Sequence, residues 1–281
     1  MRAQNHKKGA PSYHPKAAEL VIQGAIYELE ERYDKALDAY SEALIYAPNS
    51  ASICYAVAKN YIMLGKVDTG MQMLERSIKL DSNYVDSQRL LAALYHRKGD
   101  IEAAEKHYLQ IVRIDPSDAD AHLSLAGIYQ ARKEYDKAAV HYQALIDQGL
   151  ASADIYFKLG ELYIEQEKYD AAEQVFESYI RDNPQDERGY LAVGAIYIAK
   201  KDTTGAIQWY RKTLQENEGF MGVRDELANT LVAVKDVNGA IQLFEEVTRN
   251  DSLDLAANIR LGDLYFTKGD TSKALDIYAK T

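Results

Sequence analysis

Hydrophobic residues recur along this chain with a period of 34 residues. The chain divides without insertion from Ala17 into repeats one to eight: 17–50, 51–84, 85–118, 119–152, 153–186, 187–220, 221–254 and 255–281. The eleventh position is large and apolar in every repeat: Tyr27, Tyr61, Tyr95, Tyr129, Tyr163, Tyr197, Leu231 and Tyr265. Such a regular period predicts a stack of similar structural units, because a catalytic constellation needs to occur only once.

Two further positions hold small residues in all repeats. Position eight is Gly or Ala from Gly24 to Gly262, and position twenty is Gly or Ala from Ala36 to Ala274. Positions 7, 8 and 11 share one face of a helix, and positions 20, 24 and 27 share one face of a second helix. Turn signals such as Gly65-Lys66 lie between them. Each repeat is therefore predicted to form two antiparallel helices that approach closely at the small residues.

This pattern resembles the tetratricopeptide repeat family. The resemblance is carried by LVIQGAIYELEERYDKALDAYSEALIYAPN at 20–49, by YFKLGELYIEQEKYDAAEQVFESYI at 156–180, and by their counterparts in the other repeats. It implies an all-α solenoid in which antiparallel helix pairs stack into a right-handed superhelix with a concave groove. We expect a basic flexible tail at 1–16 and a repeat domain at 17–281, with seven full repeats and a partial eighth.

The composition agrees with a helical protein and excludes some kinds of structural site. Hydrophobic residues make up 47% of the 281 residues and there are only 5 prolines, which favours helices. The single cysteine, Cys54, excludes a disulfide framework or a cysteine-based zinc site. No apolar run is long enough to predict a membrane span. A cytoplasmic location is expected, and an extracytoplasmic compartment that needs no disulfides stays open.

The charge is divided unevenly between the two ends of the chain. Residues 1–16 carry four basic and no acidic residues, whereas the remainder holds 29 basic and 43 acidic residues. An acidic body argues against nucleic acid or anionic lipid as the main partner, because phosphate binding needs a basic surface.

The sequence offers little for catalysis. It contains no glycine-rich phosphate loop, no serine nucleophile elbow and no His-Glu-x-x-His stretch, so no enzyme, cofactor or metal site is predicted. His107 and His141 share one repeat position in adjacent repeats and are expected to be surface residues. Cys54 is expected to be a buried, inert thiol.

The first helix of each repeat carries the candidate binding residues. In the family, its positions 2, 5, 9 and 12 line the groove, and helical geometry places them roughly opposite the packed face. The candidate partner-binding residues are Tyr55, Ile62, Arg89, Leu123, Phe157, Leu191, Ile164 and Ile198, with Asp120, Asp154 and Glu161 as an acidic rim. They predict a protein or peptide partner with apolar anchors and basic flanks. The alternative is that these side chains only pack between adjacent first helices.

The predicted function is a protein-interaction scaffold or adaptor that binds a partner segment in the groove. Two alternatives stay open. The chain could be the repeat arm of a larger enzyme or assembly factor, since its eighth repeat stops within the second helix. It could also be a scaffold that self-associates through its end repeats.

Overall fold

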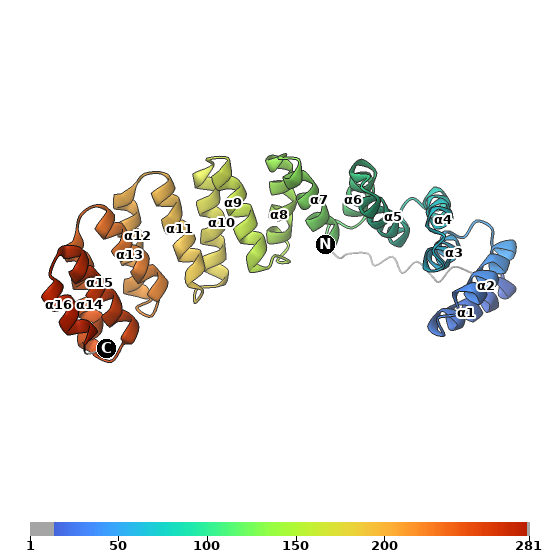
Figure 1. The fold of residues 1–281 in the computed structure, drawn as a ribbon. Coiled ribbons are helices and arrows are strands. Elements are labelled where there is room, and N and C mark those ends of the chain that lie inside the picture. The colour runs from blue at the N-terminus through green and yellow to red at the C-terminus, as the bar shows by residue number, and fades with distance from the viewer. Residues whose placement is uncertain (1–13, 280–281) are drawn as a thin grey trace, which may run out of the picture. The chain divides into compact units, whose positions relative to one another are not determined.

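A computed structural model describes residues 14–279, which form sixteen helices and no strand (Figure 1). This confirms the all-α fold predicted from the sequence. Most of the expected tail, 1–16, lies outside the described residues. Pro15 and Lys16 belong to the first helix, because proline at the first helical position needs no hydrogen-bond acceptor for its nitrogen.

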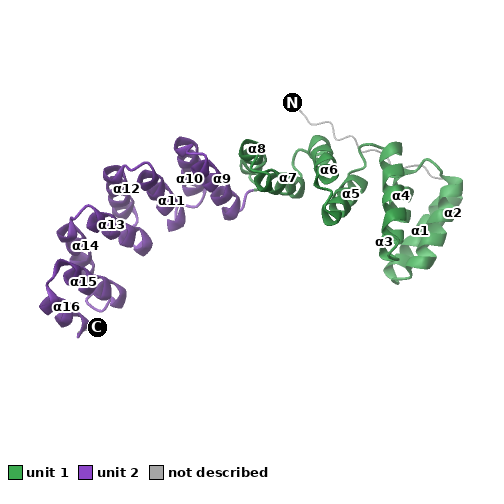
Figure 2. Cartoon of the chain, turned by 45° about the horizontal axis from the view of Figure 1, so that its top comes forward, with its two compact units in different colours: residues 1–150 green, residues 151–281 purple. Residues whose placement is uncertain are grey.

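The chain divides into two compact units, residues 1–150 and 151–281 (Figure 2). Unit 1 contains α1 (Pro15–Leu29), α2 (Tyr33–Tyr46), α3 (Ala51–Met63), α4 (Val67–Leu80), α5 (Val85–Lys98), α6 (Ile101–Ile114), α7 (Ala119–Ala131) and α8 (Tyr135–Asp147). Unit 2 contains α9 (Ala153–Glu165), α10 (Tyr169–Asp182), α11 (Glu187–Ala199), α12 (Thr203–Glu216), α13 (Met221–Ala233), α14 (Val237–Asn250), α15 (Leu255–Lys268) and α16 (Thr271–Tyr278). Odd-numbered helices are therefore the first helices of the repeats, and within each unit every helix packs against the next.

The small residues at positions 8 and 20 allow the close helix contacts that the sequence predicted. A Cβ atom added to Gly194 would lie 2.1 Å from Cε1 of Tyr210, the position-24 residue of the same repeat. A Cβ atom added to Gly70, at position 20, would lie 2.9 Å from the carbonyl oxygen of Ala58 at position 8. Glycine at these positions makes room for a buried ring in one case and a neighbouring backbone in the other.

The turn between the two helices of a repeat uses the same backbone conformation in all eight repeats. Position 15 always has a positive φ angle, but only three of its eight residues are glycine: Glu31, Gly65, Gly99, Lys133, Glu167, Lys201, Lys235 and Gly269. The sequence signals identified only the glycine-containing turns. The other five adopt the left-handed conformation at a cost of roughly 1 kcal/mol each, which the packed helix pair must offset.

The tyrosines at position 11 link successive repeats as well as filling space within one. In four repeats the tyrosine hydroxyl donates a hydrogen bond to a glutamate on the second helix of the preceding repeat. These pairs are Tyr95 with Glu75, Tyr129 with Glu105, Tyr197 with Glu173, and Tyr265 with Glu245. A cation at position 14 reinforces two of these links, since Arg132 bridges Glu102 and Glu105, and Lys200 bridges Asp170 and Glu173.

Replacing Tyr129 by Phe is expected to lower the free energy of unfolding by about 1–2 kcal/mol. The Tyr129 side chain is buried, and its hydroxyl lies 2.7 Å from Oε1 of Glu105. Burial alone would raise the pKa of Glu105, but hydrogen bonds from Tyr129 and Arg132 outweigh it and hold that pKa below its usual value. Urea denaturation at neutral pH measures the loss.

The matched control is Tyr61→Phe. Tyr61 occupies the same repeat position and is half-buried, and no hydrogen bond of its hydroxyl is found among residues 14–279. Its replacement should change stability by less than about 0.5 kcal/mol. Equal losses for the two variants would mean that the tyrosine–glutamate link contributes nothing.

Candidate functional site

We call the side of the first helices that carries repeat positions 2, 5, 9 and 12 the inner face. Position 9 is open to solvent in both units, as at Ala93 and Gly127 in unit 1 and Ala195 in unit 2. Position 8, one residue earlier, is buried in every repeat. The boundary between the exposed inner face and the buried face therefore falls between positions 8 and 9 of the first helix.

Tyr55 and Ile62, on α3 in unit 1, are half-buried rather than open. Both pack against the core cluster formed by Ala58, Met71 and Leu74 among others. The Tyr55 ring also contacts the Tyr84 ring at a centroid distance of 5.6 Å. Packing occupies much of their surface, so the alternative of a structural role is favoured at these two positions.

Arg89, on α5 in unit 1, is held by an ion pair that the sequence did not predict. Its Nη2 lies 2.5 Å from Oδ2 of Asp118, whose side chain is only 5% exposed. Asp118 also caps α7 by accepting from the backbone N–H of Ala121 at 2.9 Å. Asp120 lies 3.8 Å from the same guanidinium and is largely exposed. The pair fixes Arg89 between two repeats. Leu123, at the same position of the next repeat, is 39% exposed.

Phe157 and Ile164, on α9 in unit 2, are half-buried against the cluster of Ala172, Phe176, Val193 and Ile196. The Phe157 ring lies 5.4 Å from the Phe176 ring and 5.3 Å from the Tyr179 ring. The guanidinium carbon of Arg188 stands 5.5 Å from its centroid. Phe157 is thus packed against two rings, and the Arg188 guanidinium lies over its own ring.

Arg188 is itself fixed by its neighbours. It donates hydrogen bonds to both carboxylate oxygens of Asp186 and to the Tyr179 hydroxyl, which in turn donates to Asp186. Hydrogen bonds from Arg188 hold the pKa of Asp186 far below its ordinary value. The cluster places one compensated positive charge at the start of α11, where the equivalent residues of repeats three to five are aspartates.

The remaining candidates in unit 2 are more open. Leu191 is half-buried, Ile198 is 44% exposed, and Asp154 and Glu161 are exposed. Two further apolar residues on the inner face, Ile259 and Phe266, are exposed, Phe266 to 64%. Neither was among the candidate residues predicted from the sequence. Their positions, 5 and 12 of repeat eight, were the available signal.

The histidines differ from the surface positions predicted for them. His141 is buried and His107 is half-buried. His141 faces His122 with an Nδ1–Nδ1 distance of 3.0 Å, and His107 Nδ1 lies 2.7 Å from Oε1 of Gln88. In both cases the partner lies at position 4, on the first helix of the same repeat. The side chain at position 23, on the second helix, therefore points toward the first helix. Within residues 14–279 no group of three or more metal-ligating side chains is found. Cys54 is buried as predicted, and burial raises its thiol pKa.

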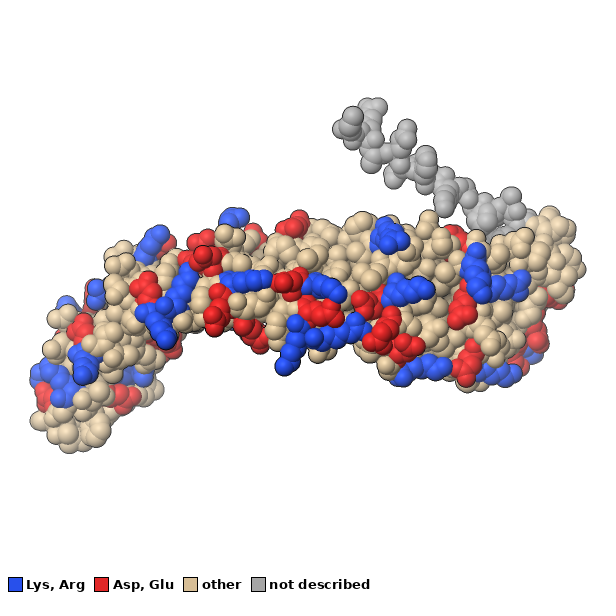
Figure 3. All heavy atoms as spheres, turned by 90° about the horizontal axis from the view of Figure 1, so that it is seen from above, with Lys and Arg blue, Asp and Glu red and all other residues tan. Residues whose placement is uncertain are grey.

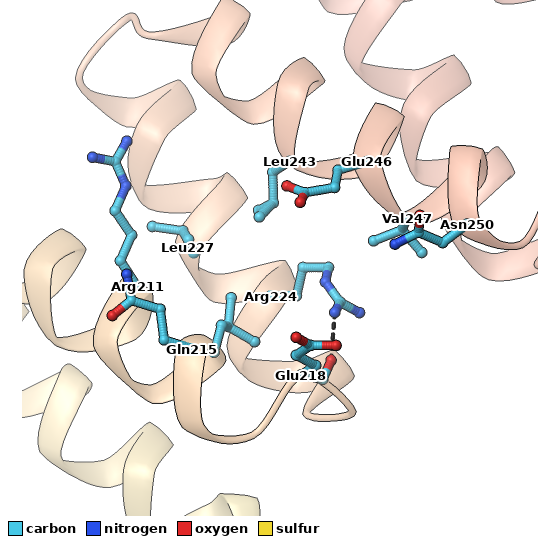
Figure 4. A pocket seen from close by; sticks show the side chains of 10 residues that line it. Arg211, Gln215, Glu218, Arg224, Leu227, Leu243, Glu246, Val247 and Asn250 are labelled. Atoms are coloured by element: carbon cyan, nitrogen blue, oxygen red, sulfur yellow. Dashed lines mark hydrogen bonds between the residues drawn. The ribbon is translucent and has the colours of Figure 1, made fainter.

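A cavity lies in unit 2 between the second helices α12 and α14. It has a volume of about 330 Å³, and its lining includes Leu227 of α13 and Leu243 and Val247 of α14 (Figure 4). Arg224 also lines it and donates to the backbone oxygen of Glu218. The cavity mixes apolar walls with both charges and contains no arrangement for covalent chemistry among the side chains that line it.

The charged side chains are mixed on the surface. On the face drawn in Figure 3, Lys and Arg lie interspersed with Asp and Glu over the part of the chain that the structure describes. In that same part, every helix is too short or too polar to cross a lipid bilayer.

Stacked two-helix repeats with an open inner face define a helical-repeat protein. The tetratricopeptide repeat family model matches residues 29–94, 65–128 and 129–196, and a second tetratricopeptide repeat model matches residues 226–281. The chain belongs to the tetratricopeptide repeat family. The family consists generally of non-catalytic interaction scaffolds.

Curated relatives share only part of their length with this chain. Tetratricopeptide repeat protein 21A of Mus musculus is 29% identical over 102 residues, which are 36% of this chain and 8% of that protein. TPR repeat-containing protein YpiA of Bacillus subtilis is 29% identical over 76 residues, which are 27% of this chain and 18% of that protein. The matched segments thus span a small fraction of these relatives.

Two solved structures share the fold. The structure of Naa15/Naa10 bound to HypK-THB aligns with a TM-score of 0.64 at 14% identity and covers 94% of this chain and 41% of that one. The C-terminal part of a TPR repeat-containing protein of Cytophaga hutchinsonii aligns with a TM-score of 0.52 at 16% identity and covers 86% and 99%. At these identities the likeness concerns the fold alone.

Proposed function

We propose that this protein is an interaction scaffold that binds a segment of a partner protein on the inner face of its first helices. The observation that carries the proposal is the open apolar surface of that face in unit 2. Ile198 and Phe266 are large apolar side chains left 44% and 64% exposed at position 12 of their repeats. Exposed apolar side chains at equivalent positions of a repeat are the anchors that a partner needs.

Charge supports a partner with basic flanks. Asp120 lies beside Leu123 in unit 1, and Asp154 and Glu161 flank Phe157 in unit 2. All three carboxylates are exposed, so their contribution is steering and orientation rather than large binding energy. Arg89, Tyr55 and Ile62 are assigned a supporting role, because their side chains are already engaged in packing or in an ion pair.

The proposal is tested by capture of partners from a lysate of the source cells with three forms of the immobilised chain: wild type, Ile198→Asp and Ile45→Asp. Ile45 is an equally apolar residue exposed on the second helix α2, away from the inner face. A partner is expected to be retained by wild type and Ile45→Asp and to bind Ile198→Asp at least about tenfold more weakly. Proteins retained equally by all three forms would place the binding site elsewhere.

A second candidate is the repeat arm of a larger enzyme or assembly factor. The specific observation in its favour is that the curated relatives are much longer than the segments that match this chain. The sequence of the full gene tests this candidate directly, since an adjoining catalytic domain would be visible there. Self-association through the end repeats and a cytoplasmic location stay predictions.

A further inference from the structure

Helix α11 is apolar on all sides. From Tyr190 to Ala199 its sequence is YLAVGAIYIA, ten residues without a charged or amide side chain. A helix that is hydrophobic all round is normally covered all round. Here the covering is incomplete: Tyr190, Val193, Gly194 and Ile196 are buried in the core of unit 2, whereas Ala195, Ile198 and Ala199 are exposed.

The opposite side forms an apolar surface that the core covers only in part, at Leu191 and Ala192, and we call it the α11 stripe. It consists of Leu191, Ala192, Ala195, Ile198 and Ala199, which follow the helical spacing i, i+1, i+4, i+7 and i+8. Leu191 and Ala192 are half-buried, and the other three are exposed. Ala192 and Ala195 therefore form a low floor between two larger side chains, Leu191 and Ile198, that lie two helical turns apart.

The neighbours of the α11 stripe are mainly acidic. Helix α9, which reaches α11 through the Phe157–Arg188 contact, exposes Asp154, Glu161 and Glu165 on its inner side. Its one cation there is Lys158. Helix α13, which packs directly beside α11, exposes Glu226, bound only by the amide of Asn229 at 3.4 Å. None of these four carboxylates forms a salt bridge within residues 14–279.

Other charged groups near the α11 stripe are held in ion pairs or by a hydrogen bond. Arg188 is paired with Asp186, and Asp225 of α13 with Arg260 of α15. Glu187 accepts from the backbone N–H of Gly222 at 3.0 Å. The net field over the stripe is therefore negative, and basic side chains are the ones that would complement it.

The surface suits a helix better than an extended segment. An extended peptide needs donors and acceptors for its backbone, and the α11 stripe offers none, because its side chains are Leu, Ala and Ile and the helix backbone is already hydrogen-bonded. A helix satisfies its own backbone and brings only side chains. The alanine floor allows its axis to approach closely, and the spacing from Leu191 to Ile198, about 10.5 Å along the helix, matches residues two turns apart in a partner helix.

We propose that the α11 stripe is the docking site for an amphipathic α-helix of a partner protein whose apolar face is flanked by lysines or arginines. This inference rests on the proposed function and specifies the class of its partner. Apolar residues at i, i+3, i+4 and i+7 of the partner helix cover Leu191 and Ile198, and its basic flanks face Glu161, Glu165 and Glu226.

The test uses the full chain and a fluorescent peptide of about 18 residues with Leu and Lys in an amphipathic helical pattern. Fluorescence anisotropy measures binding of this peptide, of a scrambled peptide of equal composition, and of a copy with two central prolines. The amphipathic peptide should bind at least about tenfold more tightly than the other two, and added salt should weaken this binding. Equal binding of the scrambled peptide would mean nonspecific charge attraction and would overturn the proposal.

The variant Ala195→Lys places a cation in the floor of the α11 stripe. This variant should bind the amphipathic peptide at least about tenfold more weakly than wild type. Ala93→Lys, at the same exposed position of repeat three, should change binding less than about twofold. Far-UV circular dichroism checks that both variants stay helical. Unchanged binding to Ala195→Lys overturns the proposal.

The two proposals fail in different ways. If the proline-containing peptide binds as well as the helical one, or if a captured partner depends on Ile198 but contacts the face through an extended or acidic segment, the helix inference falls and the scaffold stands. If neither capture nor peptide binding responds to substitutions on the inner face, both fall.

Discussion

Lowering the pH from about 7 to about 4.5 is expected to destabilise the folded protein by about 2.5 kcal/mol through one buried pair of imidazoles. Burial, and then the neighbouring His122, lower the pKa of His141 to about 4. In an unfolded chain histidine titrates near a pKa of about 6.5. As the pH falls below about 6.5, the unfolded chain takes up a proton that the folded chain does not, so stability decreases until about pH 4. At neutral pH and above the unfolded chain takes up no such proton, so this loss of stability is absent.

The hydrogen bonds of the pair assign its protons. Nε2 of His122 lies 3.0 Å from the carbonyl oxygen of Pro116 and must donate to it. Nδ1 of His122 is therefore the acceptor for the Nδ1–H of His141 at 3.0 Å. The Tyr129 ring stacks on His141 with a centroid distance of 5.7 Å. The neutral pair carries one N–H proton on each ring and makes both hydrogen bonds. A third proton would place a positive charge on side chains that are only 5% and 8% exposed.

The measurement is urea denaturation, followed by far-UV circular dichroism, at several pH values for wild type and the double variant His122→Leu, His141→Met. Repeat two shows that a cysteine and a methionine, Cys54 and Met73, serve at the same two positions. The double variant should lose about 2 kcal/mol less than wild type over the same pH range. Parallel pH profiles for the two proteins would contradict the assignment. The control variant is His96→Gln, because His96 is exposed on α5.

Replacing Phe176 by Ala is expected to lower the free energy of unfolding by about 3–5 kcal/mol. Phe176, on α10, is 2% exposed. A Cβ atom on Gly160 would come within 2.2 Å of its Cζ, so the ring lies directly against the facing helix. Truncation therefore loses the buried area and leaves a cavity that rigid helix contacts cannot close.

The matched substitution is Phe157→Ala, which removes the ring that contacts Phe176 from the half-open inner face. It should cost about half as much as Phe176→Ala, because part of that ring already faces solvent. Trp209, the single tryptophan, packs against the same cluster and reports unfolding of this region by fluorescence. Equal losses for the two variants would make Phe157 a packing residue and remove it from the candidate anchors. A small loss combined with weaker partner capture would support its role as an anchor.

Much of the fold was predictable because it depends on local periodicity. The spacing of Gly160, Ala172 and Phe176 specifies two helix faces that meet within one repeat, and the same spacing recurs eight times. Helix formation and the contact between paired helices involve residues fewer than 34 apart, so the pattern within one repeat describes them. The conformation of the turn was predictable only where glycine occupies position 15, because Glu31 and Lys201 adopt a positive φ angle that neither residue favours.

The candidate site was predictable only as a set of positions. The sequence assigned Tyr55, Arg89, Phe157 and Ile198 to positions 5 and 12 of their repeats, and their environments differ: Ile198 is exposed, Tyr55 and Phe157 are half-buried, and Arg89 is held in an ion pair. Position alone does not measure how far neighbouring repeats cover each side chain. Arg89 is engaged because Asp118, twenty-nine residues later, caps the next first helix within its reach.

The sequence by itself determined the helical class, the 34-residue period and the small residues at the helix contacts. These features follow from the 3.6-residue period and from side-chain size, which are properties of the chain. Only the tertiary structure decided that His141 is buried against His122, that Arg89 is held by Asp118, and that the open apolar side chains lie at Ile198 and Phe266. These outcomes depend on the distances between side chains that adjacent helices bring together, and burial and ion pairing change over a few ångströms that no periodicity records.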